Sequence, residues 1–397
     1  MSVLGGVRVL DLTNVLSGPF CTLHLALLGA DVVKIENPKA GDLARVLGNV
    51  PKYNKMLMGT SFLAQNANKR SLTLNLKAPE GREIFKKLVT TADVVVENFR
   101  PDVMTRLGLG YPVLAGINPR LVYCAISGFG QTGPDAEKPA YDQIIQGLSG
   151  VMDVNGDERL HPLRAGFPVC DTVGGLNAAF AILAALYHRE RTGEGQMIDV
   201  ALLDSIMPLL GWVAANLLIG GQSPVPMGND NFTAAPSGSF ATQDGHVNIA
   251  ANKQEQWEAM AEVIGAPELV ADSRFKERDE RKKNRKALTP LVEEKLRQKP
   301  TAHWVEALNA RDVPSGDILS LGAALAQPQL RHRGTLQSVE LPEIGTVPVF
   351  GLSAALEKTP GAVRTPPPRL GEHTAEVLGC LGFSREDVAA LQEKGIV

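Results

Sequence analysis

The chain contains 397 residues, of which 44% are hydrophobic and 21% are charged. This is the composition of an ordinary globular protein with a large core and two or three domains. The formal net charge of −3 supplies no general attraction to nucleic acid or to an anionic membrane, so we expect neither as a partner.

The start of the chain lacks the charged region, apolar stretch and cleavage site of a signal peptide. The two longest apolar stretches, 176–187 and 200–219, are respectively too short and too interrupted by polar residues to cross a bilayer. Four widely spaced cysteines show no zinc or disulfide pattern, and the histidines form no metal-binding pair. We therefore expect a cytoplasmic protein without a metal.

Short β-branched runs alternate with helical patterns from residue 7 to residue 201, which predicts an α/β fold with a parallel sheet covered by helices. The expected strands are Val7–Leu12, Val32–Glu36, Val94–Glu97, Leu121–Ile126 and Met197–Ala201, and the expected helices are Pro19–Leu28, Pro79–Val89 and Leu176–Tyr187. Ligands bind at the carboxyl ends of such strands, where loops beginning at Asn14, Asn98 and Ser127 would meet. Dinucleotide and ATP motifs are absent from the sequence, which argues against nicotinamide, flavin and ATP.

The character of the sequence changes after residue 220. Residues 221–236 are rich in Gly, Pro and Asn and predict a loop, after which a hairpin at 239–250 and a helix at Lys253–Ile264 begin a new unit. Strand-like alternation at 336–350 and a helix at His373–Leu391 follow. We expect a large α/β domain over 1–220, a small α/β domain over 221–330, and a linker and tail over 331–397 that return to the large domain.

Asp171 stands at the start of the most apolar helical pattern, Leu176–Tyr187. Aspartate is a favoured N-cap, because its oxygens accept the free N–H groups of a helix and the helix dipole stabilises its charge. A lone carboxylate at such a place can also act as a nucleophile. The local sequence by itself favours the cap.

Motifs in a fixed order carry a resemblance that covers nearly the whole chain. Six of them are GVRVLDL at 6–12, LGADVVKIE at 28–36, NKRSLTLNL at 68–76, ENFRP at 97–101, NPRLVY at 118–123 and LGEHT at 370–374. Two further stretches, SGFGQTGP at 127–134 and HRERTGEGQ at 188–196, carry most of the weight. With these motifs the chain resembles the family III CoA transferases, which include carnitine CoA-transferase, formyl-CoA transferase, the bile-acid-inducible F group and the α-methylacyl-CoA racemases.

The resemblance implies a large Rossmann-like domain with a parallel sheet, a smaller α/β domain, and a homodimer of two interlocked rings. It implies transfer of CoA from an acyl-CoA donor, with succinyl-CoA as a candidate, to a carboxylic acid. By position Asp171 would be the nucleophile, passing through an aspartyl anhydride and an aspartyl-CoA thioester. One thioester is exchanged for another of similar energy, so no tightly bound cofactor is expected, and coenzyme A or acyl-CoA enters as substrate.

The resemblance also implies two groups of site residues. Contacts to CoA are expected from Val15, Leu72, Thr73, Leu74, Asn75, Asn98, Phe99, Arg100, Arg106 and Lys138, where the basic side chains suit phosphates. The candidates for the substrate site are Leu16, Tyr141, Asp142, Gly174, Gly175 and Gly228. Glycines at 174 and 175 would let the backbone approach the reacting carbonyl, and they also suit tight helix packing.

Two departures from the family's branches narrow the expected reaction. Racemases of the family carry a His in a Gly-His-Asp-Ile-Asn-Tyr motif, and Tyr141 stands at that position here, although a phenol is a poor general base at neutral pH. Formyl-CoA transferase has a Gln in the loop after its first strand, whereas this loop, Asn14–Pro19, contains none. We therefore expect a dicarboxylate larger than oxalate. A racemase or epimerase, and a non-catalytic acyl-CoA-binding protein, are the alternatives.

Overall fold

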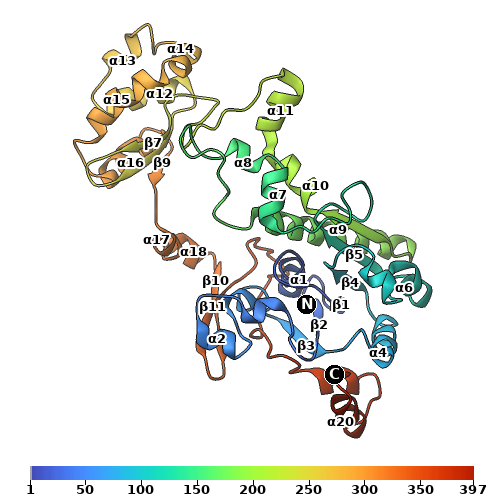
Figure 1. Cartoon of the computed structure of the whole chain (residues 1–397). Coiled ribbons are helices and arrows are strands. Elements are labelled where there is room, and N and C mark those ends of the chain that lie inside the picture. The colour runs from blue at the N-terminus through green and yellow to red at the C-terminus, as the bar shows by residue number, and fades with distance from the viewer. Residues whose placement is uncertain (1) are drawn as a thin grey trace. The chain divides into compact units, whose positions relative to one another are not determined.

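The computed structural model describes residues 2–397 (Figure 1). The chain forms two compact units: the first comprises the residues up to Val151, Arg164–Ser223 and Gln329–Val397, and the second comprises Met152–Leu163 and Pro224–Pro328. The chain thus leaves the first unit twice, and the short segment Met152–Leu163 joins the second unit ahead of its main part.

A six-stranded sheet forms the centre of the first unit, with the strand order β3-β2-β1-β4-β5-β6. All five pairings are parallel. The strands are β1 (Arg8–Asp11), β2 (Asp31–Glu36), β3 (Lys69–Thr73), β4 (Val94–Glu97), β5 (Val122–Ser127) and β6 (Met197–Ala201). The order reverses between β1 and β4, and in open α/β sheets ligands bind outside the carboxyl ends of the strands at such a switch point.

Helices cover both faces of this sheet, because the alternate residues of its strands point to opposite sides. Leu10 and Val95 belong to one core cluster, with α4 (Pro79–Val89) and α6 (Tyr111–Ile117). Val9 and Val96 belong to the other, with α1 (Ser17–Leu27), α7 (Asp142–Leu148) and α9 (Val169–Thr192). Figure 1 shows the two helical layers on either side of the strands. The α/β fold with a parallel sheet is therefore confirmed.

The helix expected at Leu176–Tyr187 is much longer in the structure, since α9 runs from Val169 to Thr192. The helix expected at His373–Leu391 is in fact two, α19 (Thr374–Gly379) and α20 (Arg385–Glu393), separated by a turn in which Gly382 has φ 87°. Strand β3 was not among the expected strands. It begins with Lys69 and Arg70, whose charges hide its buried position.

The other elements of the first unit are short. They are η1 (Leu43–Val46), α2 (Pro51–Lys55), α3 (Thr60–Leu63), α5 (Val103–Arg106), α10 (Leu202–Ile206), η2 (Met207–Leu210), α11 (Gly211–Gly220), α18 (Pro328–His332), β10 (Leu336–Leu341) and β11 (Gly345–Phe350). The last two strands pair as an antiparallel hairpin within residues 336–350, where the alternating pattern indicated strand structure. The short helix α8 (Val151–Val154) begins at the last residue before the chain enters the second unit.

The second unit has its own sheet and core. An antiparallel sheet of order β7-β8-β9 is built from β7 (Ser237–Ala241), β8 (His246–Ala250) and β9 (Ser315–Asp317). Its helices are α12 (Gln254–Val263), α13 (Glu268–Ala271), α14 (Arg278–Lys283), α15 (Arg285–Leu296), α16 (Thr301–Asn309) and α17 (Leu321–Leu325). Trp257 and Trp304 are buried in the apolar cluster that joins sheet and helices.

Two helical segments, Val169–Thr192 and Leu202–Gly220, are long and apolar enough to cross a membrane by length and composition. The first is one of the core helices that cover the sheet, and the second is divided into α10, η2 and α11. The expectation that the first segment is too short is therefore wrong for the helix as it stands. Length and apolar composition are weak evidence for a membrane span when a helix packs into a core.

Candidate active site

A cavity of about 220 Å³ lies in the first unit, where the segments that follow β1, β4 and β5 meet. This is the switch point of the sheet, the expected place for a ligand in this architecture. It is lined by Asn14, Val15, Leu16, Ser17, Asn98, Phe99, Ile126, Ser127, Gly128, Ala140, Tyr141, Asp171 and Leu202. The structure thus brings Val15, Leu16, Asn98, Phe99, Tyr141 and Asp171 of the predicted site together.

Asp171 is the only carboxylate among the residues that line this cavity. It is the third residue of α9, and the residue before the helix, Pro168, has no capping side-chain bond. The interpretation of Asp171 as a helix cap is therefore wrong. The helix begins three residues earlier than a cap at 171 would require, so the Asp171 side chain is left to face the cavity.

The electrostatic surroundings of Asp171 disfavour its charge. Burial and the nearby charge of Asp142 raise the pKa of the Asp171 carboxyl to about 7. The expectation that free N–H groups hold this carboxylate in its ionised form is thus wrong, because burial and a like charge dominate. A carboxylate with a raised pKa is more basic when it does ionise, and such groups are frequent at functional sites.

Asp142 performs the capping that the sequence suggested for Asp171. Its Oδ1 accepts hydrogen bonds from the backbone N–H groups of Cys170 (2.8 Å) and Asp171 (3.3 Å). These N–H groups belong to the first turn of α9, where a helix has no internal acceptors. Asp142 itself is the first residue of α7 and is buried. Asp142 does not line the cavity, so it contacts the backbone of the nucleophile candidate without forming part of the cavity wall.

The neighbouring thiol is a poor alternative nucleophile. Cys170 is fully buried, and burial together with the nearby charges of Asp142 and Asp171 raises its pKa to about 12. A thiol reacts through its thiolate, which is negligible at neutral pH under these conditions.

The glycines at 174 and 175 allow close packing beneath the cavity. A Cβ at Gly174 would collide with the side chain of Leu202, and a Cβ at Gly175 would collide with the backbone carbonyl oxygen of Ser17. Leu202 and Ser17 both line the cavity. The absence of a side chain therefore lets α9 approach α10 and the first residue of α1, which brings Asp171 and the loop after β1 to the same cavity.

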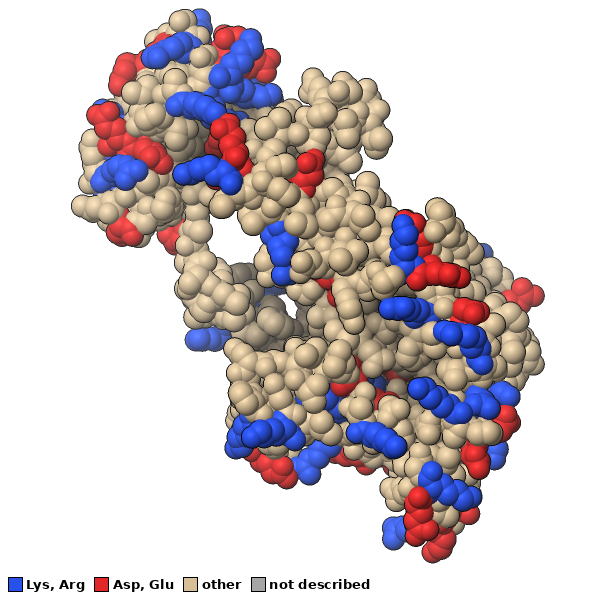
Figure 2. Space-filling view, in the orientation of Figure 1, with Lys and Arg blue, Asp and Glu red and all other residues tan. Residues whose placement is uncertain are grey.

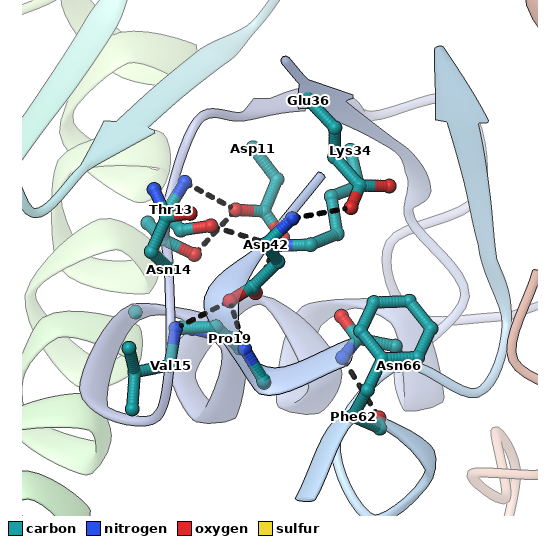
Figure 3. Close-up of polar contacts among 12 residues, drawn as sticks. Asp11, Thr13, Asn14, Val15, Pro19, Lys34, Glu36, Asp42, Phe62 and Asn66 are labelled. Carbon is teal, nitrogen blue, oxygen red and sulfur yellow. Dashed lines mark hydrogen bonds and ion pairs between the residues drawn. The ribbon is translucent and has the colours of Figure 1, made fainter. Parts of the chain in front are cut away.

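The loop after β1 has an unusual backbone at Val15, whose φ is 67°. This left-handed conformation is strained for a β-branched residue. The N–H of Val15 donates to Asp42 Oδ1 (2.9 Å), as the dashed line in Figure 3 shows. On the other side Asn14 and Asn98 exchange two bonds: Asn14 N–H donates to Asn98 Oδ1 (2.8 Å), and Asn98 Nδ2 donates to the Asn14 carbonyl (2.9 Å). Asp42 and Asn98 therefore both hold the loop in place.

Beneath this loop lies a buried network of charges. Lys34 Nζ contacts Asp42 Oδ2 (2.9 Å) and donates to the Thr13 carbonyl (2.6 Å), and Figure 3 shows Asp11, Lys34 and Asp42 beside Thr13, Asn14 and Val15 of the loop. Lys69 Nζ pairs with Asp11 Oδ2 (3.1 Å). Burial raises the pKa of Asp11, but Lys69 and Lys34 outweigh burial and lower the pKa to about 2.

A second buried pair extends the network. Arg45 binds both oxygens of Glu36, each at 2.7 Å, and its Nη1 donates to the Pro368 carbonyl (3.2 Å). Both side chains are buried. Such buried pairs define a geometry when every partner is satisfied, and they are costly when one member is removed.

Glu97 ends β4 directly before the cavity residues Asn98 and Phe99. Its Oε2 accepts the N–H of Phe99 (2.8 Å), and its Oε1 accepts the Tyr123 hydroxyl (3.2 Å). Burial raises the pKa of Glu97 to about 7, although both hydrogen bonds oppose the shift. Glu97 thus orients the Phe99 backbone from below the cavity.

A second, larger cavity has a volume of about 800 Å³. Many of its lining residues closely follow those of the first cavity in the sequence. This cavity is lined by Arg100, Pro101, Asp102, Thr105, Arg106, Gln131, Thr132, Gly133, Pro134, Ala136 and Glu137. Segments 98–101 and 127–134 contribute to both cavities. Two of the basic residues predicted to bind CoA are therefore in one cavity, and the third, Lys138, directly follows its wall and pairs with Asp135 (2.7 Å).

Nine predicted site residues line neither cavity: Lys138, Asp142, Gly174 and Gly175, described above, and Leu72, Thr73, Leu74, Asn75 and Gly228. Leu72 and Leu74 are buried in the hydrophobic core, and Thr73 bonds to Thr374 through both its N–H and its hydroxyl. Asn75 donates its N–H to the Ile396 carbonyl. Contacts of CoA with this segment remain predictions. Gly228 belongs to the second unit, where its N–H donates to the Gly156 carbonyl (2.7 Å).

Several lining residues were not among the predicted site residues. They are Asn14, Ser17, Ile126, Ser127, Gly128, Ala140 and Leu202. The signal for the first five was their place in loops at, or directly beside, the ends of β1 and β5, which the alternation of strands and helices had placed at one edge. Among residues 2–397, no group of three or more His, Cys, Asp and Glu side chains is arranged to hold a metal.

Comparisons with known proteins agree with this architecture. The model of CoA-transferase family III matches residues 4–374. A succinyl-CoA:glutarate CoA-transferase from Homo sapiens is 36% identical over 398 residues, which cover 99% of this chain and 90% of that protein. An acetyl-CoA:oxalate CoA-transferase from Acetobacter aceti is 42% identical over 332 residues, covering 83% and 84%.

A solved structure has the same fold. The crystal structure of a CAIB/BAIF family protein from Brucella suis matches with a TM-score of 0.84 and 36% identity, covering 96% of this chain and 99% of that one. The chain therefore belongs to CoA-transferase family III, and it is a CoA transferase. This confirms the family and the enzyme class that the ordered motifs predicted.

Proposed function

We propose that Asp171 is the nucleophile of the transfer. The observation that carries this proposal is its position as the only carboxylate lining a cavity at the switch point of the sheet. An Asp171 oxygen attacks the carbonyl carbon of the donor thioester, the C–S bond breaks, and CoA leaves as the thiolate. The product is a mixed anhydride between Asp171 and the donor acid.

The CoA thiolate then attacks the aspartyl carbonyl of the anhydride. This step releases the donor acid as its carboxylate and forms an aspartyl-CoA thioester. The acceptor carboxylate repeats the two steps in reverse order, so every bond broken is matched by one formed. Ser17 begins α1 at the cavity wall, and the free N–H groups of a helix start favour the developing oxyanion.

Covalent trapping tests the nucleophile. The enzyme is incubated with an acyl-CoA donor without acceptor, treated with hydroxylamine or borohydride, digested, and analysed by mass spectrometry. We expect the modification on the peptide that contains Asp171 and no labelling in Asp171→Asn. A label on Cys170 or on no residue of the 165–175 segment would contradict the proposal.

We infer that CoA spans the two cavities, with its thioester in the smaller and its phosphates beside Arg100 and Arg106 in the larger. The continuous segment Asn98–Pro101, which lines both, supports this path. Arg100→Ala should raise the KM for acyl-CoA about tenfold with little change in kcat, because a phosphate contact is lost. Arg385→Ala, which removes an exposed arginine on α20, is the matched control and should leave KM unchanged.

We propose succinyl-CoA as the donor and a dicarboxylate as the acceptor. The names of the Homo sapiens and Acetobacter aceti relatives support dicarboxylates as a class. The cavity of about 220 Å³ is also smaller than the roughly 300–1,000 Å³ of pockets for drug-sized ligands. Chromatography of the CoA products from succinyl-CoA with oxalate, glutarate and monocarboxylic acids tests this. Transfer to monocarboxylic acids alone would contradict it.

A racemase remains the competing reaction for the same scaffold. The cavity wall contains Tyr141 but no histidine that could exchange an α-proton. In heavy water without any acceptor acid, we expect no incorporation of deuterium at the α-carbon of a branched acyl-CoA. Incorporation at a rate comparable to transfer would favour the racemase.

We also propose a cytoplasmic homodimer, which the family resemblance gives as two interlocked rings. Large apolar side chains on α9 and α11 are exposed in the single chain: Phe180, Leu218 and Ile219 are 74%, 82% and 88% exposed. Such a surface supports a dimer, in which a second copy of the chain would bury it. Figure 2 shows α11 as a surface without charged side chains. Analytical ultracentrifugation should give twice the mass of the chain, and a monomer at micromolar concentration would contradict the dimer.

A further inference from the structure

We propose that Asp142 is a positioning residue for the reaction: it anchors the first turn of α9 from the neighbouring helix α7 and so fixes where Asp171 stands in the cavity. This inference rests on the proposed role of Asp171 as the nucleophile. The sequence suggested instead that Asp142 contributes to the substrate site. Its contacts indicate instead that it holds the backbone around the nucleophile in place.

Both oxygens of the Asp142 carboxylate are occupied by the protein. Oδ1 receives the N–H groups of Cys170 and Asp171, and Oδ2 accepts from Gln146 Nε2 at 2.6 Å. Asp142 is 8% exposed and Gln146 is fully buried. Three hydrogen bonds from the protein thus engage this carboxylate, and Asp142 does not line the cavity where a substrate would bind.

Gln146 extends the anchor to the segment that enters α9. Its Nε2 also donates to the Phe167 carbonyl (3.2 Å), and its Oε1 accepts the Ala165 N–H (2.9 Å). Asp142 and Gln146 are one helical turn apart on α7 and therefore face the same side. Together they hold the backbone of residues 165–171 at four N–H or C=O groups.

The charge of Asp142 has a second effect on Asp171. After burial, it is the second cause that raises the pKa of the Asp171 carboxyl. When Asp171 forms its anhydride or its thioester, the negative charge leaves with the thiolate or the released acid. The repulsion between the two carboxylates ends at that moment, so Asp142 favours the covalent intermediates over the free enzyme.

Other titratable groups around Asp171 do not provide this charge. Tyr141 is the only other titratable residue that lines the cavity, and the Cys170 thiol remains neutral because its pKa is raised to about 12. The elements packed against α9 carry further groups outside the cavity: His24 on α1, Asp204 on α10, Tyr123 and Cys124 on β5, and Asp199 on β6. Asp142 is therefore the carboxylate that acts on the nucleophile.

The test compares Asp142→Asn with the double variant Asp142→Asn/Gln146→Glu. The single variant removes the charge and also sets two amide NH2 groups against each other. The double variant restores a donor and an acceptor between the two side chains and places the carboxylate on residue 146, whose side chain contacts neither the Cys170 nor the Asp171 N–H group. Asp204→Asn removes an exposed carboxylate from α10, which also packs against α9, and serves as the matched control.

The measurements are the pH profile of kcat/KM, the KM for acyl-CoA, and the rate of covalent labelling of Asp171. We expect the rising limb of the profile to move to lower pH by about 1 unit in both variants. Labelling at saturating acyl-CoA should slow about tenfold or more in the single variant and partly recover in the double variant. KM should remain within about twofold, and the control should match the wild type.

The outcomes separate this inference from the function on which it rests. If the wild type is never labelled at Asp171, the proposed nucleophile is wrong. If the wild type is labelled but the limb and the labelling rate stay unchanged in the variants, Asp142 has no positioning role. Should the single variant fail to fold, the limb of the double variant decides, because its side-chain pairing is intact.

Discussion

The carboxylate of Asp42 holds the backbone of Val15 in a left-handed conformation, with a distance of 2.9 Å between Val15 N and Asp42 Oδ1. The same carboxylate pairs with Lys34 through its other oxygen. A strained residue in the cavity wall is thus tied to a buried ion pair beneath it. This relationship predicts separate effects on stability and on activity.

Asp42→Asn should lower the free energy of unfolding by about 3–5 kcal/mol, because it removes the charge of the carboxylate that contacts the buried Lys34 ammonium. The double variant Asp42→Asn/Lys34→Met should recover most of this loss. Urea unfolding of the single and double variants measures both values. If the single variant is as stable as the wild type, the pair does not contribute as its burial indicates.

Val15→Gly should leave the free energy of unfolding within about 1 kcal/mol of the wild type. Relief of the left-handed strain, of order 1–3 kcal/mol, is offset by the greater freedom of glycine in the unfolded chain. The kcat should nevertheless fall about tenfold, because the loop becomes less fixed. Val15→Ala keeps the strain and loses the side chain, so it should be less stable than Val15→Gly. The opposite order would show that the backbone is not strained.

Asp171→Asn should stabilise the protein at alkaline pH while it abolishes transfer. The pKa of this carboxyl is 3.8 in the unfolded chain and about 7 in the folded one. The folded state therefore loses stability as the pH rises from about 4 to 7, and the full cost of about 4 kcal/mol applies above pH 7. Urea unfolding should show the gain of the variant at pH 8 and almost none at pH 4. An equal gain at both values would exclude the raised pKa as its cause.

Gly175→Ala should destabilise the protein by about 1–3 kcal/mol, because the new Cβ meets the Ser17 carbonyl and separates α9 from α1. The KM for the acceptor acid should rise as the cavity wall shifts. Gly116→Ala is the matched control, since no atom lies near its Cβ position on α6. It should stabilise the protein by about 1 kcal/mol through helix propensity. Thermal unfolding and steady-state kinetics distinguish the two variants.

Two strands with β-branched residues could be predicted from the sequence. Val94–Glu97 and Met197–Ala201 were predicted with the bounds that the structure has. The central strand β4 is buried along its whole length, whereas the edge strand β6 is buried only at Val200 and Ala201. Strand β3 could not be predicted, since the burial of Lys69 depends on Asp11, which is 58 residues away. A local sequence pattern cannot predict an ion pair between residues on different strands of a sheet.

The candidate site shows the same division. Asp171 was identified from motif order, and its loop neighbours from the ends of strands. The true cap of α9 could not be predicted, because Asp142 lies on another helix and reaches the N–H groups across 28 residues of sequence. The start of α9 was misplaced for a related reason: Gly174 and Gly175 weaken a helical pattern, and only packing against Leu202 and Ser17 explains their presence.

The sheet order places reactivity and selectivity on different parts of the chain. Loops after β1, β4 and β5 shape the wall of the cavity, whereas the nucleophile candidate stands on α9, whose first turn bonds to Asp142 on α7. An enzyme built in this way can acquire a new acceptor acid through substitutions at Leu16 or Tyr141 while its chemical step stays intact. Engineering of the acceptor range should therefore begin in these loops and leave the α7–α9 contact unchanged.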